Sequence, residues 1–280
     1  MTPVRLGILA ASRIADPAVV RPARGDNAVP GVELVAVAAR DETRARDAAA
    51  RWGVPRVYGS YAALLDDPEV DAVYIGTPAG LHRPWAVAAI EAGKHVLVEK
   101  PIANNADDAQ LIVDAAHAHP GVVVMEAFHW RYHPMATRIA EVIASGVLGR
   151  LVRVEAVFDV PDGRIPRGDI RWDLALGGGA TMDLGCYAIQ LVRHAVAAAG
   201  DIAVPEVVRA EAVVPEPEID GALRAELRWP SGVTGEIRSS MISSADDTIV
   251  SLVATGERGT LTADNPLSPQ TRPASLRIET

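Results

Sequence analysis

The sequence predicts an α/β protein in which a doubly wound parallel sheet is followed by an α+β domain with an open, mainly antiparallel sheet. As far as about residue 125, short apolar runs alternate with segments of helical character, which is the pattern of a parallel sheet with helical crossovers. Beyond that point, helical segments are followed by strand-like segments of alternating polarity with turns that contain Pro or Gly. We therefore expect two domains, at 1–124 and 125–280.

The composition excludes several classes of protein. The chain has 280 residues and a formal net charge of −9, so we do not expect nucleic acid as a partner. Its single cysteine, Cys186, excludes an internal disulfide and favours a reducing compartment, so we expect a cytoplasmic protein. No apolar run is long enough to cross a membrane and no signal peptide is visible. We also expect no metal centre.

The first domain is expected to alternate strands and helices. The strands are expected at 4–9, 32–40, 57–58, 71–75, 95–98 and 122–125. The helices are expected at 42–52, 61–65, 84–93 and 105–117. Gly53 is well placed to end the first helix, and Ser60 is well placed to cap the second. Ligands of such sheets bind beyond the carboxyl ends of the strands, so residues that directly follow a strand are candidate site residues.

Glu99, Lys100 and Pro101 directly follow the apolar strand at 95–98. The chain has 27 basic residues, of which only Lys94 and Lys100 are lysines. A desolvated lysine can lose its proton, whereas arginine cannot, so a lysine at this position is a candidate for proton chemistry. The alternative is a solvated cation after a strand.

A degraded glycine-rich pattern follows the first strand. A dinucleotide-binding loop needs Gly-x-Gly-x-x-Gly/Ala, because its backbone amides approach the pyrophosphate closely. Here Ala10, Ser12 and Ala15 stand at these positions, so the residues are small but the glycines are missing. An ordinary strand-to-helix turn is the alternative.

The end of the second strand distinguishes the two nicotinamide cofactors. A carboxylate there would bind the ribose 2′-hydroxyl of NAD, whereas an arginine accommodates the 2′-phosphate of NADP. Arg40 occupies this position and Arg44 adds positive charge, which favours NADP. In the alternative interpretation Arg40 begins a solvated loop and is neutralised by Asp41.

Thr77, Pro78 and His82 follow the strand at 71–75, in the loop where a nicotinamide ribose would lie. Taken by itself, His82 is more typical of a helix cap or a packing residue.

An aromatic cluster opens the second domain. Phe128, Trp130 and Tyr132 alternate with His129 and Arg131, so an extended segment would separate the aromatic and polar residues onto two faces. Aromatic walls with polar groups between them suit a polyol or sugar pocket. A strand that packs between domains is the alternative.

The rest of the second domain is expected to combine helices with a sheet. We expect a helix at 134–145, a strand at 151–160, a loop over the site at 161–176 and a long helix at 181–199. Asp183 and Tyr187 are four residues apart in that helix, so they share a face, and the glycines at 177–179 would let a ligand approach. Tyr187 as a core residue is the alternative. Antiparallel strands are expected at 207–214, 222–229, 233–240 and 248–255.

Three motifs carry a resemblance to a known family. They are Glu99-Lys100-Pro101, Met125-Glu126-Ala127-Phe128 and Gly177-Gly178-Gly179-Ala180-Thr181-Met182-Asp183-Leu184-Gly185-Cys186-Tyr187. Together they resemble the glucose–fructose oxidoreductase, inositol dehydrogenase and rhizopine-catabolism (Gfo/Idh/MocA) family over essentially the whole chain. The chain looks most similar to the branch of dimeric dihydrodiol dehydrogenase and glucose–fructose oxidoreductase, which has a tyrosine at the position of Tyr187.

The resemblance implies a Rossmann domain at 1–124 and a domain for substrate binding and oligomerisation at 125–280. It implies an NAD(P)-dependent dehydrogenase or reductase that acts on CH–OH groups of sugars, polyols or cyclic diols. The implied catalytic residues are Lys100, Asp183 and Tyr187. The implied cofactor-binding residues are Ala10, Ser12, Arg13, Ile14, Arg40, Thr77, Pro78, His82, Glu99 and Lys100. The expected substrate-binding residues are Phe128, Trp130, Arg131, Arg171 and Trp172, of which the last two match a substrate-side segment of the family.

Two residues are candidates for the proton transfer. Tyr187 is the first choice, with Lys100 as the cation that brings the phenol from its ordinary pKa of about 10 towards neutrality. Lys100 as the proton donor is the alternative, and Asp183 would orient either the substrate hydroxyl or Lys100. Two other classes of protein stay open, namely a regulatory NAD(P)-binding sensor and a glycosidase that uses nicotinamide transiently.

The chain departs from the family at several positions. Relatives usually have glycine at the positions of Ala10 and Ser12 and asparagine at the position of Ala79, and they carry a further helix beyond the position of Thr280. We also expect a homodimer or homotetramer that forms through the C-terminal sheet, because one helix cannot cover the apolar face expected for that sheet.

Overall fold

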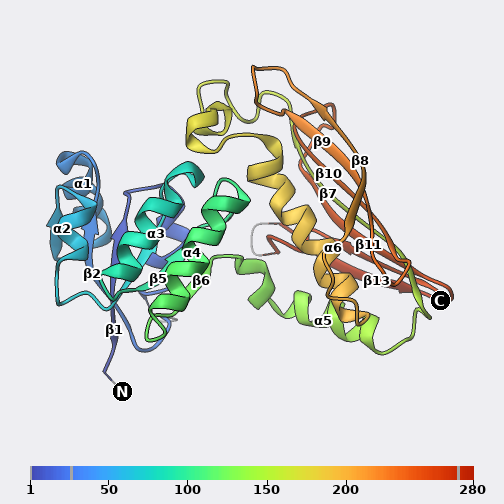
Figure 1. Cartoon of the computed structure of the whole chain (residues 1–280), viewed down its shortest axis with the longest axis horizontal. Coiled ribbons are helices and arrows are strands. Elements are labelled where there is room, and N and C mark those ends of the chain that lie inside the picture. Colours follow the sequence, from blue (N-terminus) through green and yellow to red (C-terminus); the bar gives the residue numbers. More distant parts are fainter. Residues whose placement is uncertain (1, 26–27, 270–271) are drawn as a thin grey trace. The chain divides into compact units, whose positions relative to one another are not determined.

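A computed structural model describes residues 2–25, 28–269 and 272–280. The chain divides into two compact units, Met1–Ala127 and Phe128–Thr280, which are described separately (Figure 1). No helix in the described part of the chain is long and apolar enough to cross a membrane.

The first unit is built on a parallel sheet of six strands. The strands are β1 (Val4–Leu9), β2 (Val32–Ala38), β3 (Arg56–Tyr58), β4 (Ala72–Ile75), β5 (His95–Val98) and β6 (Val124–Glu126). Their order in the sheet is β3-β2-β1-β4-β5-β6, and every neighbouring pair is parallel, which confirms the predicted doubly wound sheet. The strand order reverses between β1 and β4, which is where such sheets bind dinucleotides.

Helices cover both faces of this sheet (Figure 1). They are α1 (Glu42–Trp52), α2 (Tyr61–Leu65), α3 (His82–Glu91) and α4 (Ala106–Ala118), with a π-type helical turn at Asp16–Val20. Apolar residues of α2, α3 and α4 pack in one core cluster, and those of α1 and the π-type turn pack in another. The expected caps are confirmed: Ser60 Oγ accepts a hydrogen bond from Ala63 N, and Gly53 ends α1 with a φ of +58°.

The second unit combines two main helices with a seven-stranded sheet. The helices are α5 (Pro134–Ala144) and α6 (Cys186–Ala198), and a π-type turn at Thr181–Gly185 leads into α6. The strands are β7 (Leu151–Pro161), β8 (Glu206–Val213), β9 (Ala222–Arg228), β10 (Thr234–Ser243), β11 (Ile249–Gly256), β12 (Thr260–Asp264) and β13 (Ser275–Glu279). The predicted antiparallel strands are present as β8 to β11.

The sheet differs from the prediction in its centre, where β7 lies, and at the edge that β12 and β13 form. Its order is β13-β12-β11-β7-β10-β9-β8, and β7 pairs in parallel with β10, whereas the other neighbours are antiparallel. A helical segment lies between β7 and the later strands in the sequence, so the sequence pattern alone did not place β7 inside the sheet. The sheet is therefore mixed, although mainly antiparallel as predicted.

The two faces of this sheet have different chemistry. One face packs against α6 in an apolar cluster that includes Val154 of β7 and Leu252 of β11. The other face carries ion pairs: Arg153 and Arg224 both pair with Glu236, and Arg238 pairs with Asp159. The apolar face expected from the sequence is therefore the one that packs against α6, and the other face is polar because the residues that alternate with the core positions are arginines and carboxylates.

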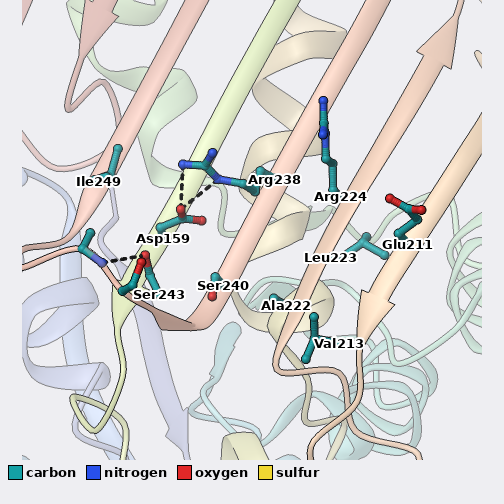
Figure 2. A pocket seen from close by; sticks show the side chains of 12 residues that line it. Asp159, Glu211, Val213, Ala222, Leu223, Arg224, Arg238, Ser240, Ser243 and Ile249 are labelled. Atoms are coloured by element: carbon teal, nitrogen blue, oxygen red, sulfur yellow. Dashed lines mark hydrogen bonds and ion pairs between the residues drawn. The ribbon is translucent and has the colours of Figure 1, made fainter.

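A hollow of about 450 Å³ lies on this charged face (Figure 2). Its lining includes Asp159, Glu211, Arg224, Arg238 and Ser240. Asp159 is 3% exposed, and its Oδ1 has no hydrogen-bond partner among the described residues, whereas its Oδ2 accepts from Arg238 at 2.9 Å. The hollow therefore combines ion-paired arginines with a buried acceptor that no described residue satisfies.

The aromatic segment that opens the second unit is not extended. His129–Tyr132 form a 3-10 turn, so alternate residues do not share a face. Trp130 is fully buried, with its ring edge-on to His194 at 5.1 Å, whereas Tyr132 is 70% exposed. The prediction of an extended aromatic wall is therefore wrong.

Candidate functional site

In the first unit, the loops that follow β1, β4 and β5 begin side by side at the carboxyl edge of the sheet. The strand ladder continues into them, because Gly76 N donates to Leu9 O at 3.0 Å and Glu99 N donates to Ile75 O at 3.0 Å. A Cβ atom at Gly76 would lie 2.7 Å from Ser12 Oγ, so the first two loops are in close contact. The sequence-predicted residues Ser12, Thr77 and Glu99 are thus gathered at one edge.

Two buried hydroxyl groups at this edge have no hydrogen-bond partner among the described residues. Ser12 Oγ and Thr77 Oγ1 are buried and make no hydrogen bond within the described part of the chain. A buried hydroxyl without a partner is costly, and a ligand with phosphate or ribose oxygens would satisfy it. The residues at this edge therefore fit a dinucleotide. Arg13 and Ile14, which lie in the same loop as Ser12, are exposed.

Ala10 has a φ of +83°, the left-handed conformation that glycine adopts without steric cost. Its amide donates to Ala38 O at 3.0 Å, which holds this geometry at the end of β1. The backbone of the phosphate-loop pattern is thus kept at this position although its glycine is replaced.

We expect the Ala10→Gly variant to be more stable than the wild type, by about 1 kcal/mol in the free energy of unfolding. The left-handed conformation costs an L-residue about 1–2 kcal/mol, and the greater flexibility of unfolded glycine offsets part of the gain. Urea denaturation measures the difference. Ala11→Gly is the matched control, because Ala11 has no positive φ and should gain nothing. A destabilised Ala10→Gly variant would contradict the strain argument.

Arg40 and Arg44 are both exposed near the end of β2. Asp41 caps α1 by accepting hydrogen bonds from Thr43 N at 2.8 Å and Arg44 N at 3.3 Å. No ion pair of the Arg40 side chain is found in the residues that the structure describes. Burial raises the pKa of Tyr61, and the positive charges of Arg40 and Arg44 oppose this rise. Asp41 therefore serves as a helix cap, and Arg40 is not neutralised by it.

Glu99 is oriented by a residue that the sequence analysis missed. Tyr74, fully buried in β4, donates from its hydroxyl to Glu99 Oε1 at 2.8 Å, and Glu99 Oε2 accepts from Lys100 N at 3.2 Å. Glu126 holds the backbone of the loop that follows β5, since its Oε1 accepts a hydrogen bond from Ile102 N at 2.7 Å. The available signal was a tyrosine inside an otherwise aliphatic strand.

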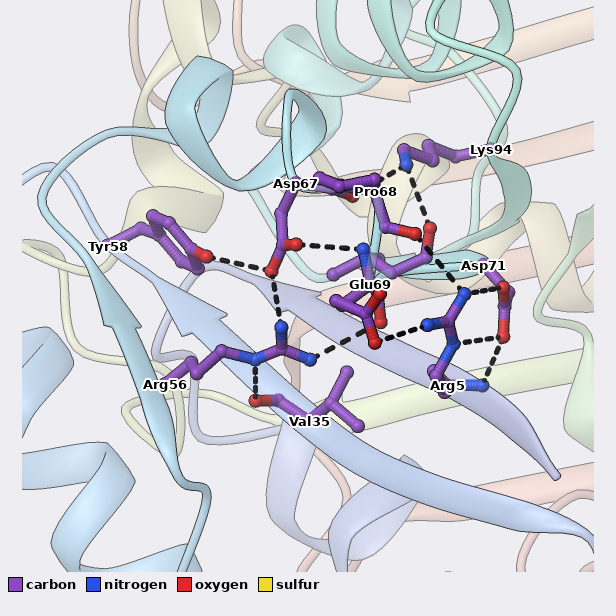
Figure 3. A network of polar contacts seen from close by, with 10 residues as sticks. Arg5, Val35, Arg56, Tyr58, Asp67, Pro68, Glu69, Asp71 and Lys94 are labelled. Carbon is purple, nitrogen blue, oxygen red and sulfur yellow. Dashed lines mark hydrogen bonds and ion pairs between the residues drawn. The ribbon is translucent and has the colours of Figure 1, made fainter.

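The two lysines have different surroundings. Lys94 is buried before β5, and its Nζ donates to Asp67 O at 2.7 Å and Val70 O at 2.8 Å (Figure 3). Asp67 in turn accepts from the Tyr58 hydroxyl, so Lys94 belongs to a network that holds the fold together. Lys100 instead follows β5 at the carboxyl edge. The lysine that was singled out for chemistry is therefore the one at the candidate site.

His82 is 1% exposed, and its ring contacts two backbone carbonyls. Nδ1 lies 2.7 Å from Pro101 O, and Nε2 lies 2.8 Å from Thr77 O. Both ring nitrogens are thus engaged by the protein. This geometry corresponds to the packing role that the sequence analysis kept as the alternative.

In the second unit, Tyr187 lies near the start of α6 among aromatic rings. It is 8% exposed, and its ring is 5.5 Å from Phe128, 6.0 Å from His129 and 5.7 Å from Phe158. These contacts fix the orientation of the ring. The predicted substrate residue Phe128 is thereby brought against the predicted catalytic residue Tyr187.

Asp183 is paired with a cation. Arg171 Nε lies 2.6 Å from Asp183 Oδ2, and Arg171 Nη1 lies 3.0 Å from Asp169 Oδ1. Although burial opposes it, the charges of Asp183 and Asp169 raise the pKa of Arg171. Arg171 thus bridges Asp183 and Asp169 and orients the Asp183 carboxylate.

The glycines at 177–179 make room for protein atoms. A Cβ at Gly178 would lie 2.7 Å from Arg171 O, and a Cβ at Gly179 would lie 2.3 Å from Asp220 Oδ1. Asp220, which the sequence analysis missed, also accepts from Thr181 N at 2.8 Å. Two of these glycines therefore fix the start of the helix on its neighbours, which differs from the expected role of admitting a ligand.

The remaining predicted substrate residues are spread over the second unit. Trp172 donates from Nε1 to Ile165 O at 3.3 Å, and the guanidinium of Arg167 lies 4.0 Å from the centre of its ring. Arg131 is exposed, whereas Trp130 is in the core. No group of three or more possible metal ligands occurs in 2–25, 28–269 and 272–280.

The strand order of the first unit, and the two buried hydroxyls that no described residue satisfies at its carboxyl edge, are those of a dinucleotide-binding domain. A family described as "Oxidoreductase family, NAD-binding Rossmann fold" matches residues 5–128, and the "GFO/IDH/MocA C-terminal domain" matches residues 136–262. The chain belongs to the Gfo/Idh/MocA family.

Similar proteins include named enzymes. The chain is 41% identical over 211 residues to D-xylose 1-dehydrogenase (NADP(+)) 2 of Haloferax volcanii, covering 74% of this chain and 62% of the relative. It is 36% identical over 218 residues to trans-1,2-dihydrobenzene-1,2-diol dehydrogenase of Mus musculus, covering 77% and 62%. The chain thus spans less than two thirds of these relatives.

A solved structure extends the similarity to the whole fold. A tyrosine-to-phenylalanine variant of KijD10, a 3-ketoreductase from Actinomadura kijaniata in complex with TDP-benzene and NADP, matches with a TM-score of 0.87 at 31% identity. The match covers 99% of this chain and 82% of that chain.

Proposed function

We propose that this protein is an NADP-dependent oxidoreductase that transfers a hydride between nicotinamide and a C–OH or C=O carbon of a sugar, polyol or cyclic diol. The observation that carries the proposal is the carboxyl edge of the parallel sheet, where no described residue forms a hydrogen bond with the buried hydroxyls of Ser12 and Thr77. The named relatives, which act on xylose, a cyclic diol and a ketone, support the same class of reaction.

The first unit is proposed to bind the cofactor. The phosphates would be held by the loop of Ala10, Ser12, Arg13 and Ile14, the 2′-phosphate by Arg40, and the nicotinamide end by residues of the next two loops. The latter residues are Thr77, Pro78, Glu99 and Lys100. When bound, NADP supplies the acceptor or donor of the hydride.

The second unit is proposed to bind the substrate. Tyr187 would hold the proton that the substrate oxygen gains or loses, and Lys100 would supply the positive charge that lowers the pKa of the phenol. Asp183, which pairs with Arg171, would accept a hydrogen bond from a substrate hydroxyl. Phe128, Arg131, Arg171 and Trp172 would contact or shape the substrate, whereas Trp130 supports the core.

The test measures the nicotinamide absorbance while the protein is incubated with NADP or NADPH and a panel of aldoses, polyols, cyclic diols and the corresponding ketones. A change in absorbance reports NADP reduction or NADPH oxidation. Turnover with at least one member of the panel supports the proposal. NADP binding without turnover would favour a sensor instead. Product release without a net change in nicotinamide absorbance would favour a glycosidase.

The cofactor preference is predicted to depend on Arg40. We expect Arg40→Asp to weaken NADP binding about tenfold more than NAD binding, because a charge-assisted contact with the 2′-phosphate is lost and a like charge is introduced. Fluorescence titration with both cofactors measures this ratio, and Arg46→Asp on the exposed side of α1 is the control. Equal weakening of both cofactors would rule out the 2′-phosphate assignment.

We further propose a homodimer or homotetramer that pairs through the charged outer face of the C-terminal sheet. A face with interspersed arginines and carboxylates can pair with a rotated copy of itself, because each arginine can meet a carboxylate of that copy. The single cysteine, Cys186, supports a cytoplasmic location.

Sedimentation at micromolar concentration is expected to show a dimer or tetramer. Arg224→Ala should weaken it, because Arg224 lines the hollow on this face. Arg150→Ala, which removes a cation paired with Glu257, should not. A monomeric wild type would contradict the proposal.

A further inference from the structure

The ring of His82 lies between two groups that can only accept hydrogen bonds. Nδ1 faces the carbonyl oxygen of Pro101 and Nε2 faces that of Thr77, both at hydrogen-bond distance. A neutral imidazole has one N–H, so it can donate to only one of these carbonyls and turns a lone pair towards the other. The imidazolium form has two N–H groups and can donate to both.

These two carbonyls belong to the loops that follow β4 and β5. We propose that His82 is a positioning residue whose imidazolium form ties these two loops together and strengthens NADP binding; the inference rests on the proposed cofactor site. The loops carry Thr77, Glu99 and Lys100, so their spacing decides how well the edge is arranged before the cofactor arrives. Preorganisation of this kind lowers the free energy cost of binding.

The charges around the ring make the equilibrium adjustable. Burial lowers the pKa of His82 from its ordinary value of 6.5. Among the described residues, the negative charge of Glu99 favours the imidazolium, whereas the positive charge of Lys100 disfavours it. On the neighbouring helices, Arg83 of α3 is already paired with Asp108 of α4 at 3.1 Å.

The sign of the pH dependence follows from this lowered pKa. At His82 the folded protein binds fewer protons than the unfolded chain just below pH 6.5, so the contribution of this residue to the stability of the free protein decreases as the pH falls through this interval. NADP binding should instead become tighter as the pH falls, because the protonated form is the one that holds both loops. By linkage, NADP must then raise the pKa of His82, by one unit for each tenfold of tighter binding.

The first test is nuclear magnetic resonance of the protein labelled with ¹⁵N in its histidine rings, titrated with acid in the absence and presence of saturating NADP. We expect that both ring nitrogens of His82 carry protons below its pKa, and that NADP raises that pKa by about one unit. His82→Gln identifies the His82 signals by their loss. A ring that stays neutral at every pH at which the protein is folded would overturn the inference.

The second test measures the NADP dissociation constant of the wild type, His82→Gln and His117→Gln across the same pH range. Glutamine has one nitrogen and cannot replace both contacts, and His117 is an exposed histidine of the same unit. The titration of the 2′-phosphate affects all three proteins equally. We expect the wild type and His117→Gln to share an additional tightening of about tenfold at low pH, which His82→Gln lacks.

The two proposals fail in different ways. A wild type that binds no NADP at any pH would refute the proposed function, while the titration of the free protein would still decide whether His82 ties the loops as an imidazolium. A wild type that binds NADP with the same pH dependence as His82→Gln, and without a pKa shift at His82, would overturn the inference alone. If His82→Gln does not fold, the pKa shift in the wild type decides the question.

Discussion

Tyr187→Phe is expected to lower the turnover number by about 10²–10⁴, the usual contribution of a general acid or base, while NADP binding is unchanged. The substitution removes only the hydroxyl. The ring keeps its edge contact with Phe128 and its packing on Phe158, so the fold should persist. Steady-state kinetics and a cofactor titration of the same preparation separate the two effects. Tyr132→Phe, which removes an exposed hydroxyl from the same unit, is the matched control.

The role of Lys100 is tested together with Tyr187. If Lys100 lowers the pKa of the phenol, Lys100→Met should move the alkaline limb of the pH–rate profile upward, because the phenol loses its cation. Lys100→Arg should also be severe, since a guanidinium is larger and does not give up a proton. The effects of Lys100→Met and Tyr187→Phe should be strongly non-additive if the two residues act as one unit.

One combination of results would contradict the role of Tyr187 in proton transfer. If Lys100→Met keeps the wild-type alkaline limb and Tyr187→Phe remains active, Tyr187 serves only in packing. Lys100 or Asp183 would then have to handle the proton.

The fold of the first unit could be predicted from the sequence because its signals are local. Apolar runs such as Ala72–Ile75 are buried on both faces, as expected for strands of a parallel sheet. Capping residues such as Ser60 and Gly53 indicate where the helices begin and end. The connection rules of parallel sheets then limit the possible strand orders, and the structure shows which of them is adopted. The second unit was harder, because the parallel pairing of β7 with β10 joins segments that are far apart in the sequence.

The candidate site could be predicted as far as its residue types, but not as far as their partners. Arg171 and Asp183 were both singled out, yet their ion pair depends on the turn at Ile170–Trp172 folding back on the helix start. Tyr74 and Asp220 went unnoticed because neither follows a strand in a recognisable motif. The 3-10 turn at His129–Tyr132 also went unnoticed, because an alternating pattern fits a strand equally well.

Arg171→Met is expected to lower kcat/KM about a hundredfold. Its guanidinium Nε lies 2.6 Å from Asp183 Oδ2, and a partly buried carboxylate that loses a paired cation has a higher pKa. If Asp183 must be ionised to accept a hydrogen bond from the substrate, activity is lost when it is protonated. The acid limb of the pH–rate profile should therefore move to higher pH in Arg171→Met.

Two matched variants isolate this effect. Arg171→Lys keeps the charge but cannot reach Asp183 and Asp169 with the same planar group, so it should recover only part of the activity and most of the wild-type acid limb. Arg167→Met removes a neighbouring arginine that stacks on Trp172 without contacting Asp183, so its acid limb should not move. NADP binding should be unchanged in all three variants, because these arginines lie outside the proposed cofactor unit. An Arg171→Met variant that is folded and keeps the wild-type acid limb would show that Asp183 does not depend on Arg171 for its charge.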